Sequence, residues 1–250
     1  MKPRLYCPMA LHSGDVIELP AAAAHHAARV LRLREGDAVT LFNGEGGEFD
    51  ATLVRIETRL TLSAIGKHQA IERESTLNVT LLQGLAGADR MDYAIQKAVE
   101  MGVAAIAPLT MARSVTRLDP VRAAKRAEHW RSVIVASCEQ CGRNRLPLLH
   151  PLSGLSDALE RLHGAMGDGT SAALSLVLAP GEGIPLPKFE RPLSAIRLLI
   201  GPEGGLTADE LAAAVRAGFR VASLGPRVLR TETSGPAALA AMNALWGDWR

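Results

Sequence analysis

The sequence has few cysteines and no metal-binding pattern. Three cysteines occur among 250 residues, and two of them, Cys138 and Cys141, form a CxxC pair. A structural zinc site needs further nitrogen or sulfur ligands at comparable spacing, and Cys7 alone does not supply them. His25 and His26 likewise stand apart from any HExxH motif. We therefore predict no metal site and interpret the paired cysteines as ordinary helix residues in a reducing compartment.

Long hydrophobic segments are also missing. No apolar run reaches the length of about 18 residues that a membrane-spanning helix needs, and no hydrophobic leader is visible. The sequence therefore predicts an unexported, cytoplasmic protein. Because 48% of the residues are hydrophobic, we expect a substantial buried core, in one large domain or two ordinary ones.

Aromatic residues are scarce, and basic residues are unevenly placed. Only 4% of the residues are aromatic, which leaves few platforms for stacking nucleobases. The net charge is +2, but residues 110–147 carry an excess of five positive charges, so the rest of the chain sums to minus three. The basic residues of this segment are Arg113, Arg117, Arg122, Lys125, Arg126, Arg131, Arg143 and Arg145. They form either a face that binds phosphates or a solvated helix side.

The pattern along the chain predicts two domains. Residues 1–70 contain short alternating segments around a glycine-rich turn at 43–47, which indicate a β-rich unit with a helix at 21–33. The polar residues 66–76 mark the boundary. From residue 75 to 250, apolar runs alternate with amphipathic segments, a pattern typical of an α/β domain with a mainly parallel sheet.

Capping signals mark the ends of several helices in the second domain. They comprise Asp89 and Gly102 for one helix, Asp119 with Pro120 for the next start, and a Thr207 and Glu210 capping box followed by Gly218. Residues 235–249, rich in alanine and leucine, are predicted to form the last helix.

Two glycine-rich loops follow strands in the last quarter of the chain. They are IGPEGG (200–205) and LGPRVLRTET (224–233). Loops after parallel strands lie at the carboxyl edge of the sheet, where α/β proteins bind ligands. Neither the GxGxxG of a dinucleotide site nor the GxxxxGK followed by Ser or Thr of a P-loop is present. We therefore expect one shared pocket for a ligand other than NAD or ATP, although a tight strand-to-helix turn is the simpler reading of IGPEGG.

These loops resemble the carboxyl-terminal signature of the RsmE family, the 16S ribosomal RNA uridine-N3 methyltransferases of the SPOUT superfamily. The family's central motifs are similar to DRMDYAIQKAVEMGV (89–103), PLTMARSV (108–115) and CEQCGRNRLP (138–147). Its amino-terminal RNA-binding domain resembles RVLRLREGD and LFNGEGGEFDA. The resemblance thus covers almost the whole chain.

The resemblance implies an α/β protein with two domains. Residues 1–70 are expected to form a PUA-like β-barrel, and residues 75–250 a SPOUT domain tied in a deep trefoil knot. Periodicity alone indicates no knot, because threaded chains are rare. The expected cofactor is S-adenosylmethionine, bound in the knot. The expected partners are 16S rRNA within the small ribosomal subunit and a second copy of the chain, with active sites close to the subunit interface.

The resemblance also implies roles for individual residues. Cofactor binding is expected at Leu178, Leu199, Ile200, Gly201, Glu203, Gly204, Leu224, Gly225, Leu229 and Arg230. Seven arginines are expected to position RNA phosphates, namely Arg4, Arg29, Arg32, Arg113, Arg117, Arg143 and Arg145. One departure from the family lies at Ser234, Gly235 and Pro236, which makes the start of the last helix uncertain.

Methylation at a uridine N3 requires removal of its proton. We expect Arg230 to stabilise negative charge on the uracil carbonyl oxygens, and Glu232 or Glu203 to accept the proton. Alternatively, Arg230 and Glu232 pair and only brace the loop. Two other functions stay open: a SPOUT methyltransferase acting on a different RNA position, and an RNA-binding protein that keeps the fold without activity.

Overall fold

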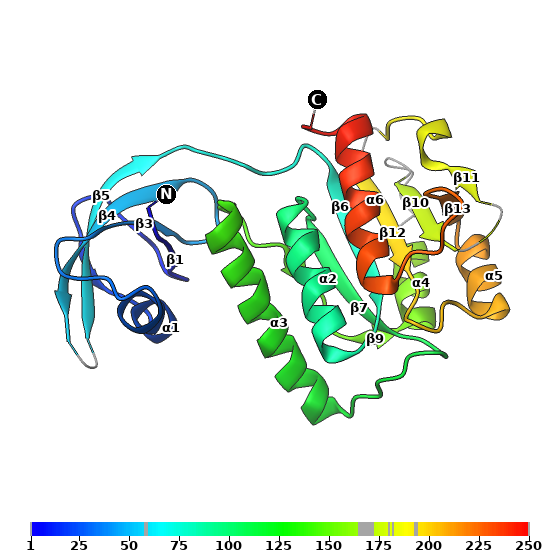
Figure 1. The fold of residues 1–250 in the computed structure, drawn as a ribbon, viewed down its shortest axis with the longest axis horizontal. Coiled ribbons are helices and arrows are strands. Elements are labelled where there is room, and N and C mark those ends of the chain that lie inside the picture. The colour runs from blue at the N-terminus through cyan, green and yellow to red at the C-terminus, as the bar shows by residue number, and fades with distance from the viewer. Residues whose placement is uncertain are drawn as a thin grey trace. The chain divides into compact units, whose positions relative to one another are not determined.

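Contacts within the chain divide it into two compact units (Figure 1). The computed structural model describes residues 2–57, 60–164, 173–179, 181, 183–192 and 195–249. One unit consists of Met1–Glu74 and Val135–Leu146, and the other of Ser75–Ile134 and Pro147–Arg250. No helix among the described residues is long and apolar enough to cross a membrane.

The first unit is built on a five-stranded sheet with the order β1-β3-β4-β5-β2. β1 is parallel to β3, and the other pairs are antiparallel. The strands are β1 (Arg4–Tyr6), β2 (Val16–Glu18), β3 (Ala38–Phe42), β4 (Glu48–Ile56) and β5 (Thr61–Gln69). The predicted β-rich unit is therefore confirmed, with the glycine-rich turn at 43–47 between β3 and β4.

A short helical segment covers the core of this sheet. The helix predicted over 21–33 is α1 (Ala21–His25), which continues as a π-helical turn, η1 (His26–Val30), and ends three residues early. Small residues on its inner side, Ala23 and Ala27, pack against Leu5, Leu41 and Leu53 of the sheet. Just after η1, the exposed Arg32 adopts a φ of 54°.

The second unit is built on a parallel sheet with the order β11-β13-β10-β12-β6-β7-β8, and β9 also pairs with β7. All pairs are parallel, as predicted from the alternation of strands and helices. The strands are β6 (Asn78–Gly84), β7 (Ala105–Thr110), β8 (Leu148–Leu149), β9 (Ser153–Gly154), β10 (Leu174–Leu178), β11 (Ile184–Pro185), β12 (Ala195–Ile200) and β13 (Arg220–Ser223).

Helices cover this sheet on both faces. They are α2 (Ala88–Glu100), α4 (Leu155–Gly164), the 3-10 turn η2 (Leu186–Lys188), α5 (Ala208–Arg216) and α6 (Thr231–Trp246). A further helix, α3 (Pro120–Cys141), adjoins α2, where His129 Nε2 and Asp92 Oδ2 are 2.6 Å apart. Neighbouring side chains of a strand point to opposite faces, so Leu82 packs with Leu159 of α4 and Ala214 of α5, whereas Leu81 lies beside Gly235 of α6. α6 packs against α2 on this second face (Figure 1).

Most of the predicted helix ends are confirmed. Thr207 and Glu210 form both bonds of a capping box, and Asp119 Oδ1 accepts a hydrogen bond from the Arg122 N–H. Gly102 and Gly218 follow their helices with positive φ. The Asp89 cap was wrong, because α2 begins at Ala88 with Gly87 as its N-cap and Asp89 lies inside the first turn.

The start of the last helix was also predicted wrongly. α6 begins at Thr231, not at residue 235, and ends at Trp246. Pro236 therefore lies inside the helix, where it removes a single backbone N–H from the second turn. The helix continues through it because the following turns bury Ala238, Leu239 and Met242.

Candidate active site

Two loops meet at the carboxyl edge of the second sheet. β10 lies between β12 and β13, so the loops that follow β12 and β13 flank the end of β10. The first is the IGPEGG loop (200–205), which leads into α5, and the second is the LGPRVLRTET loop (224–233), which leads into α6. The strand order thus brings together two loops that the sequence separates.

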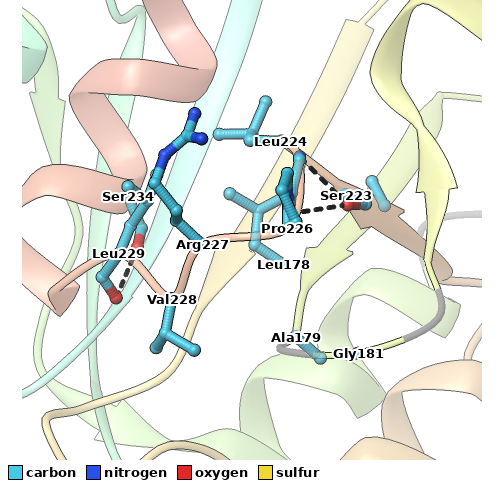
Figure 2. A pocket seen from close by; sticks show the side chains of 12 residues that line it. Leu178, Ala179, Gly181, Ser223, Leu224, Pro226, Arg227, Val228, Leu229 and Ser234 are labelled. Carbon is cyan, nitrogen blue, oxygen red and sulfur yellow. Dashed lines mark hydrogen bonds between the residues drawn. The ribbon is translucent and has the colours of Figure 1, made fainter.

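A small apolar pocket of about 150 Å³ lies between the end of β10 and the second loop. Figure 2 shows Leu178 and Leu224 on one side, with Leu229, Arg227 and Val228 on the other. Its lining also includes Ala179, Gly181, Ala222, Ser223, Gly225, Pro226 and Ser234. Complete ligand pockets typically measure about 300–1,000 Å³. The pocket therefore takes part of a larger ligand, chiefly by apolar contact.

Hydrogen bonds shape the second loop around this pocket. The Gly225 N–H donates to Ser223 Oγ at 3.1 Å, which folds the start of the loop back on β13. Ser234 Oγ donates to the carbonyl oxygens of Arg230 at 2.9 Å and Leu229 at 3.5 Å. These bonds hold the second loop in shape around the pocket.

The two loops are joined by a buried chain of hydrogen bonds. Thr231 Oγ1 donates to the Gly201 carbonyl oxygen at 2.6 Å and accepts from Gln83 Nε2 at 2.9 Å. Gln83, at the end of β6, is 1% exposed, and Thr231 is 6% exposed. Because buried hydrogen bonds are costly to break, this chain fixes the start of α6 against the first loop.

A second link passes through Glu203 on the outer side of the first loop. Glu203 Oε1 accepts hydrogen bonds from the Gly87 N–H at 2.7 Å and from Arg90 Nη1 at 3.1 Å. Arg90 Nε also lies 3.8 Å from Glu232 Oε1, in the first turn of α6. Burial acts to raise the pKa of Glu203, but the bonds from Gly87, from its own N–H and from Arg90 outweigh it, so the pKa lies below its ordinary value. Glu203 is therefore ionised at neutral pH.

Close packing explains two glycines at this edge. A Cβ on Gly84 would lie 2.6 Å from the backbone nitrogen of Pro202, and a Cβ on Gly204 would lie 2.8 Å from Arg113 Cβ. The loop after β7 is thus pressed against the first loop, where Arg113 Nη1 donates to the Gly204 and Leu206 carbonyl oxygens. Both glycines allow neighbouring loops to touch.

The residues expected to bind the cofactor fall into two groups. Leu178, Leu224, Gly225 and Leu229 line the pocket together. Leu199, Ile200, Gly201, Glu203, Gly204 and Arg230 belong to β12, the first loop or the α6 N-cap and lie outside that lining. Leu199 buries its side chain in the core with Leu82 and Leu109, so only its backbone can face a ligand at the edge.

Arg230 and Glu232, two of the residues expected to act in catalysis, do not pair with each other. Arg230 is the exposed N-cap residue of α6, and its side chain has no ion pair among the described residues. Glu232 pairs with Arg90 instead, so the braced pair of Arg230 and Glu232 is wrong. Glu203 and Glu232 each keep one buried carboxylate oxygen, Oε2, without a hydrogen-bond partner in the described part of the chain.

Two of the arginines expected to bind RNA are buried in the first unit. Arg4 Nη1 contacts Glu48 Oε2 at 2.5 Å, and Arg143 Nη2 contacts Glu74 Oε2 at 2.6 Å, with side-chain exposures of 5% and 6% for the arginines. Asn144 joins the same network through Arg4 and Glu48. The prediction for Arg4 and Arg143 is corrected, because their charges are neutralised inside the protein and out of reach of phosphates.

The other five arginines are exposed: Arg29, Arg32, Arg113, Arg117 and Arg145. Arg113 is engaged with loop carbonyls as described, and Arg145 Nη2 lies 3.4 Å from Glu72 Oε1. Arg117 lines a separate open hollow near the start of α4. Exposure keeps these five within reach of an RNA backbone, whereas their roles stay predictions.

Several residues at this edge were missed by sequence reasoning. Arg90, Gln83 and Gly84 all precede or begin α2, in or beside the DRMDY motif. The motif resembled the family, but nothing in its letters indicated contact with Glu203 or Thr231. Their position at the carboxyl end of β6 could have indicated that they lie near the site, since β6 pairs with β12 in the same parallel sheet.

Comparison with known proteins agrees with this architecture. Residues 73–243 match the RNA methyltransferase domain family, and residues 19–70 match the RNA methyltransferase PUA domain family. The chain is thus a mixed α/β protein that combines a PUA domain with a methyltransferase domain.

Individual relatives agree over nearly the whole length. Ribosomal RNA small subunit methyltransferase E of Buchnera aphidicola (subsp. Schizaphis graminum) is 30% identical over 98% of this chain and 97% of its own. The Bacillus subtilis protein of the same name is 29% identical, covering 93% and 91%.

Two crystal structures are similar in fold as well as in sequence. That of ribosomal RNA small subunit methyltransferase E from Neisseria gonorrhoeae, bound to S-adenosyl methionine, is 38% identical with a TM-score of 0.91 and full coverage of both chains. That of a Legionella pneumophila methyltransferase in complex with the cofactor SAM is 34% identical with a TM-score of 0.92 and covers 99% of each chain. The resemblance carried by the two loops is confirmed, and the chain belongs to the ribosomal RNA small subunit methyltransferase E (RsmE) family.

Proposed function

We propose that this protein transfers a methyl group from S-adenosylmethionine to N3 of a uridine in 16S rRNA of the small ribosomal subunit. One observation carries the proposal: in a chain of the RsmE family, two glycine-rich loops are joined by buried hydrogen bonds beside an apolar pocket. The cofactor bound by the Neisseria and Legionella neighbours supports the choice of methyl donor.

The chemistry of the pocket fits this cofactor. Leu178, Leu224 and Leu229 offer apolar surfaces to a purine ring, and backbone groups of the second loop can bond to its polar edge. When bound, S-adenosylmethionine supplies an electrophilic methyl group. We assign its binding to Leu178, Leu224, Gly225 and Leu229 in the pocket, with Leu199, Ile200, Gly201, Glu203, Gly204 and Arg230 at the adjoining edge.

We assign the chemistry at the uracil to Arg230 and Glu232. The exposed Arg230 guanidinium can stabilise negative charge on the uracil carbonyl oxygens as the N3 proton leaves. Glu232 is the better proton acceptor of the two acids, because Glu203 receives three hydrogen bonds and has a lowered pKa, which weakens it as a base. Glu203 then acts mainly by holding the first loop against α2.

We further propose that residues 1–70 form a PUA-like barrel that binds RNA, and that residues 75–250 form a knotted SPOUT domain. Support for the knot comes from the path of the chain. β13 pairs with β10 on the side away from β12, and the chain then returns past β12 to the start of α6, where Thr231 bonds to Gly201 and Gln83. The working form is a cytoplasmic homodimer with active sites near the subunit interface.

The RNA partner fits the exposed basic residues. Arg29 and Arg32 lie on the first unit together with the exposed apolar Val30 and Leu31. Such a surface can bind phosphates and pack against sugars without aromatic stacking. Reversing the charge of Arg29 and Arg32 should weaken RNA binding and leave cofactor affinity intact.

Methyl transfer to unmodified small ribosomal subunits, followed by mass spectrometry of the nucleosides, tests the proposal. We expect 3-methyluridine in the 16S rRNA. A different methylated nucleoside would identify another RNA methyltransferase activity, and RNA binding without methylation would identify an inactive member of the fold. Arg230→Ala should lower the rate at saturating cofactor, and full methyl transfer by this variant would exclude the role given to Arg230.

A further inference from the structure

Arg90 lies between two acids that come from different loops. It belongs to the first turn of α2, and its side chain is 48% exposed. Its Nη1 is 3.1 Å from Glu203 Oε1 of the first loop, and its Nε is 3.8 Å from Glu232 Oε1 of α6. One guanidinium thus contacts both loops of the proposed active site from a third element.

The two acids depend on this contact for their position. Each has one buried oxygen, Oε2, that no hydrogen-bond donor satisfies within the described ranges of the chain. Glu203 is held at its other oxygen by Gly87 and Arg90, whereas the Glu232 carboxylate, as far as the structure describes the chain, is held only by the Arg90 ion pair. A half-satisfied buried carboxylate is costly and moves easily toward any new donor. The neighbouring cation is what opposes such movement.

We propose that Arg90 is a positioning residue for methyl transfer, which holds Glu203 and Glu232 in place and so fixes the IGPEGG loop and the start of α6 relative to α2. The inference rests on the proposed function. Arg90 acts through the two acids and does not line the cofactor pocket, which is formed by β10, β13 and the second loop.

This placement predicts a larger effect on rate than on cofactor affinity. Misplacement of a group near the chemistry by about 1 Å can slow a reaction about a hundredfold. We expect Arg90→Met to lower kcat about tenfold or more, because Glu232 then loses its ion pair with Arg90. The dissociation constant for S-adenosylmethionine should change less than kcat, because the pocket lining is intact and only Glu203 at the adjoining edge loses a hydrogen bond.

The experiment uses the full chain and unmodified small ribosomal subunits at saturating S-adenosylmethionine, with rates measured across pH. Lys97→Met is the matched control, because Lys97 also lies on α2 and pairs with Glu100 away from the two loops. Removing the Arg90 charge favours protonation of Glu203, whose ionised form holds the first loop, so the acidic limb of the rate profile should move to higher pH in Arg90→Met and stay in place in Lys97→Met.

Two further variants separate positioning from simple loss of stability. Arg90→Lys keeps the charge but loses the planar guanidinium that contacts both acids, so it should recover part of the rate. In the Arg90→Met and Glu232→Gln double variant, the loss of rate should be smaller than the product of the two single losses, because part of the Arg90 effect passes through Glu232 and the rest through Glu203. Multiplying losses would overturn the inference, because Arg90 would then act independently of Glu232.

The outcomes also distinguish this inference from the proposed function. An inactive wild-type protein overturns the methyl-transfer proposal. An active wild-type protein with an unchanged rate and pH profile in Arg90→Met overturns only the role of Arg90. If calorimetry reveals that Arg90→Met no longer folds or binds S-adenosylmethionine, Arg90→Lys decides, and a wild-type rate and profile in that variant contradict the inference.

Discussion

The Thr231 hydroxyl donates a 2.6 Å hydrogen bond to the Gly201 carbonyl oxygen and thereby connects the first turn of α6 to the first glycine-rich loop. The same hydroxyl accepts from Gln83 Nε2 at the end of β6. A hydroxyl can fill both roles at once, which a carbonyl or an amide N–H cannot. Thr231 is therefore a junction of β6, the first loop and α6.

Thr231→Val should lower the free energy of unfolding by about 1–3 kcal/mol, because it leaves the buried Gln83 amide and Gly201 carbonyl without their partner. Cofactor affinity should fall as well, since the two loops are no longer joined. Chemical denaturation and calorimetry with S-adenosylmethionine measure the two effects. Thr233→Val is the control, because Thr233 is exposed in the same turn and should change stability little. Equal effects of both variants would contradict the prediction.

Gly84→Ala should destabilise the protein more than Gly87→Ala, although the two glycines lie only three residues apart. A Cβ on Gly84 meets Pro202 N at 2.6 Å and Met111 Sδ at 2.8 Å, so it should displace the first loop and cost about 1–3 kcal/mol. At Gly87 the nearest atom, Glu203 Oε1, is 3.5 Å away, so only the N-cap preference is lost, about 0.5 kcal/mol. Thermal unfolding of both variants is the measurement. A tolerated Gly84→Ala would mean that the two loops are not pressed together.

Arg32→Gly should stabilise the protein while weakening its binding to RNA. Arg32 has a φ of 54°, a left-handed conformation that costs most residues free energy and glycine almost none. We expect a gain of about 0.5–1 kcal/mol in unfolding free energy, together with weaker RNA affinity and a salt dependence reduced by about one phosphate contact. Arg34→Gly, at an ordinary φ, should destabilise instead. Unchanged RNA affinity in Arg32→Gly would remove Arg32 from the RNA surface.

Glu48 should make the first unit sensitive to acid. Burial acts to raise its pKa, but hydrogen bonds from Arg73, Arg4 and Asn144 outweigh it and leave the pKa below its ordinary value. A lowered folded-state pKa contributes stability above the unfolded value of about 4.3 and loses it as the pH falls through the folded value. Glu48→Gln should therefore cost about 1.5–3 kcal/mol at pH 7.

The difference between wild type and Glu48→Gln should shrink as the pH falls below about 4.3, which urea unfolding at several pH values can follow. Glu57→Gln serves as the comparison, because Glu57 forms an exposed pair with Arg55 and should have little effect at any pH. A difference between wild type and Glu48→Gln that is independent of pH would show that the Glu48 charge is not what matters.

Gly235→Ala should stabilise α6. Its Cβ would lie 3.4 Å from Leu81 Cδ1 and 3.6 Å from Gln83 Oε1, which is ordinary contact, while alanine favours the helix by about 0.5–1 kcal/mol over glycine. Gly247→Ala, just after the helix, should do the reverse because its Cβ meets Asn243 Oδ1 at 2.5 Å. The melting temperatures of the two variants, compared with that of the wild type, test this prediction. A loss of stability in Gly235→Ala would indicate that this part of α6 has no room for a methyl group.

Local features of the sequence predicted local structure. The Thr207 and Glu210 capping box and the parallel strands of the second sheet were predicted because neighbouring residues determine them. The last helix was predicted to begin at residue 235, four residues late, because Gly235 and Pro236 are typical of a helix start rather than of its interior. The helix tolerates Pro236 because packing against the sheet and α2 outweighs one missing hydrogen bond.

Contacts between distant segments could not be predicted. Asp89 was expected to cap the start of α2, but Glu203 takes this role. Its carboxylate accepts a hydrogen bond from the N–H of Gly87, which lies 116 residues earlier in the chain. Arg4 and Arg143 were predicted to bind RNA phosphates, but each pairs with an acid that is distant in the sequence. Arg4 pairs with Glu48, and Arg143 pairs with Glu74. The two loops could be predicted as a ligand site because each follows a strand, whereas their connection through Gln83 and Thr231 depends on the strand order.

The assignment of Val135–Leu146 to the first unit affects how the protein can be divided. A fragment cut between Glu74 and Ser75 would lack Asn144, which bonds to Arg4 and Glu48, and would lack Arg143, which pairs with Glu74. The charged side chains of Arg4, Glu48 and Glu74, which are buried or half-buried in the intact protein, would then face water or one another. The first unit should therefore be obtained by itself only as a circularly permuted or fused chain that carries residues 135–146 along with residues 1–74.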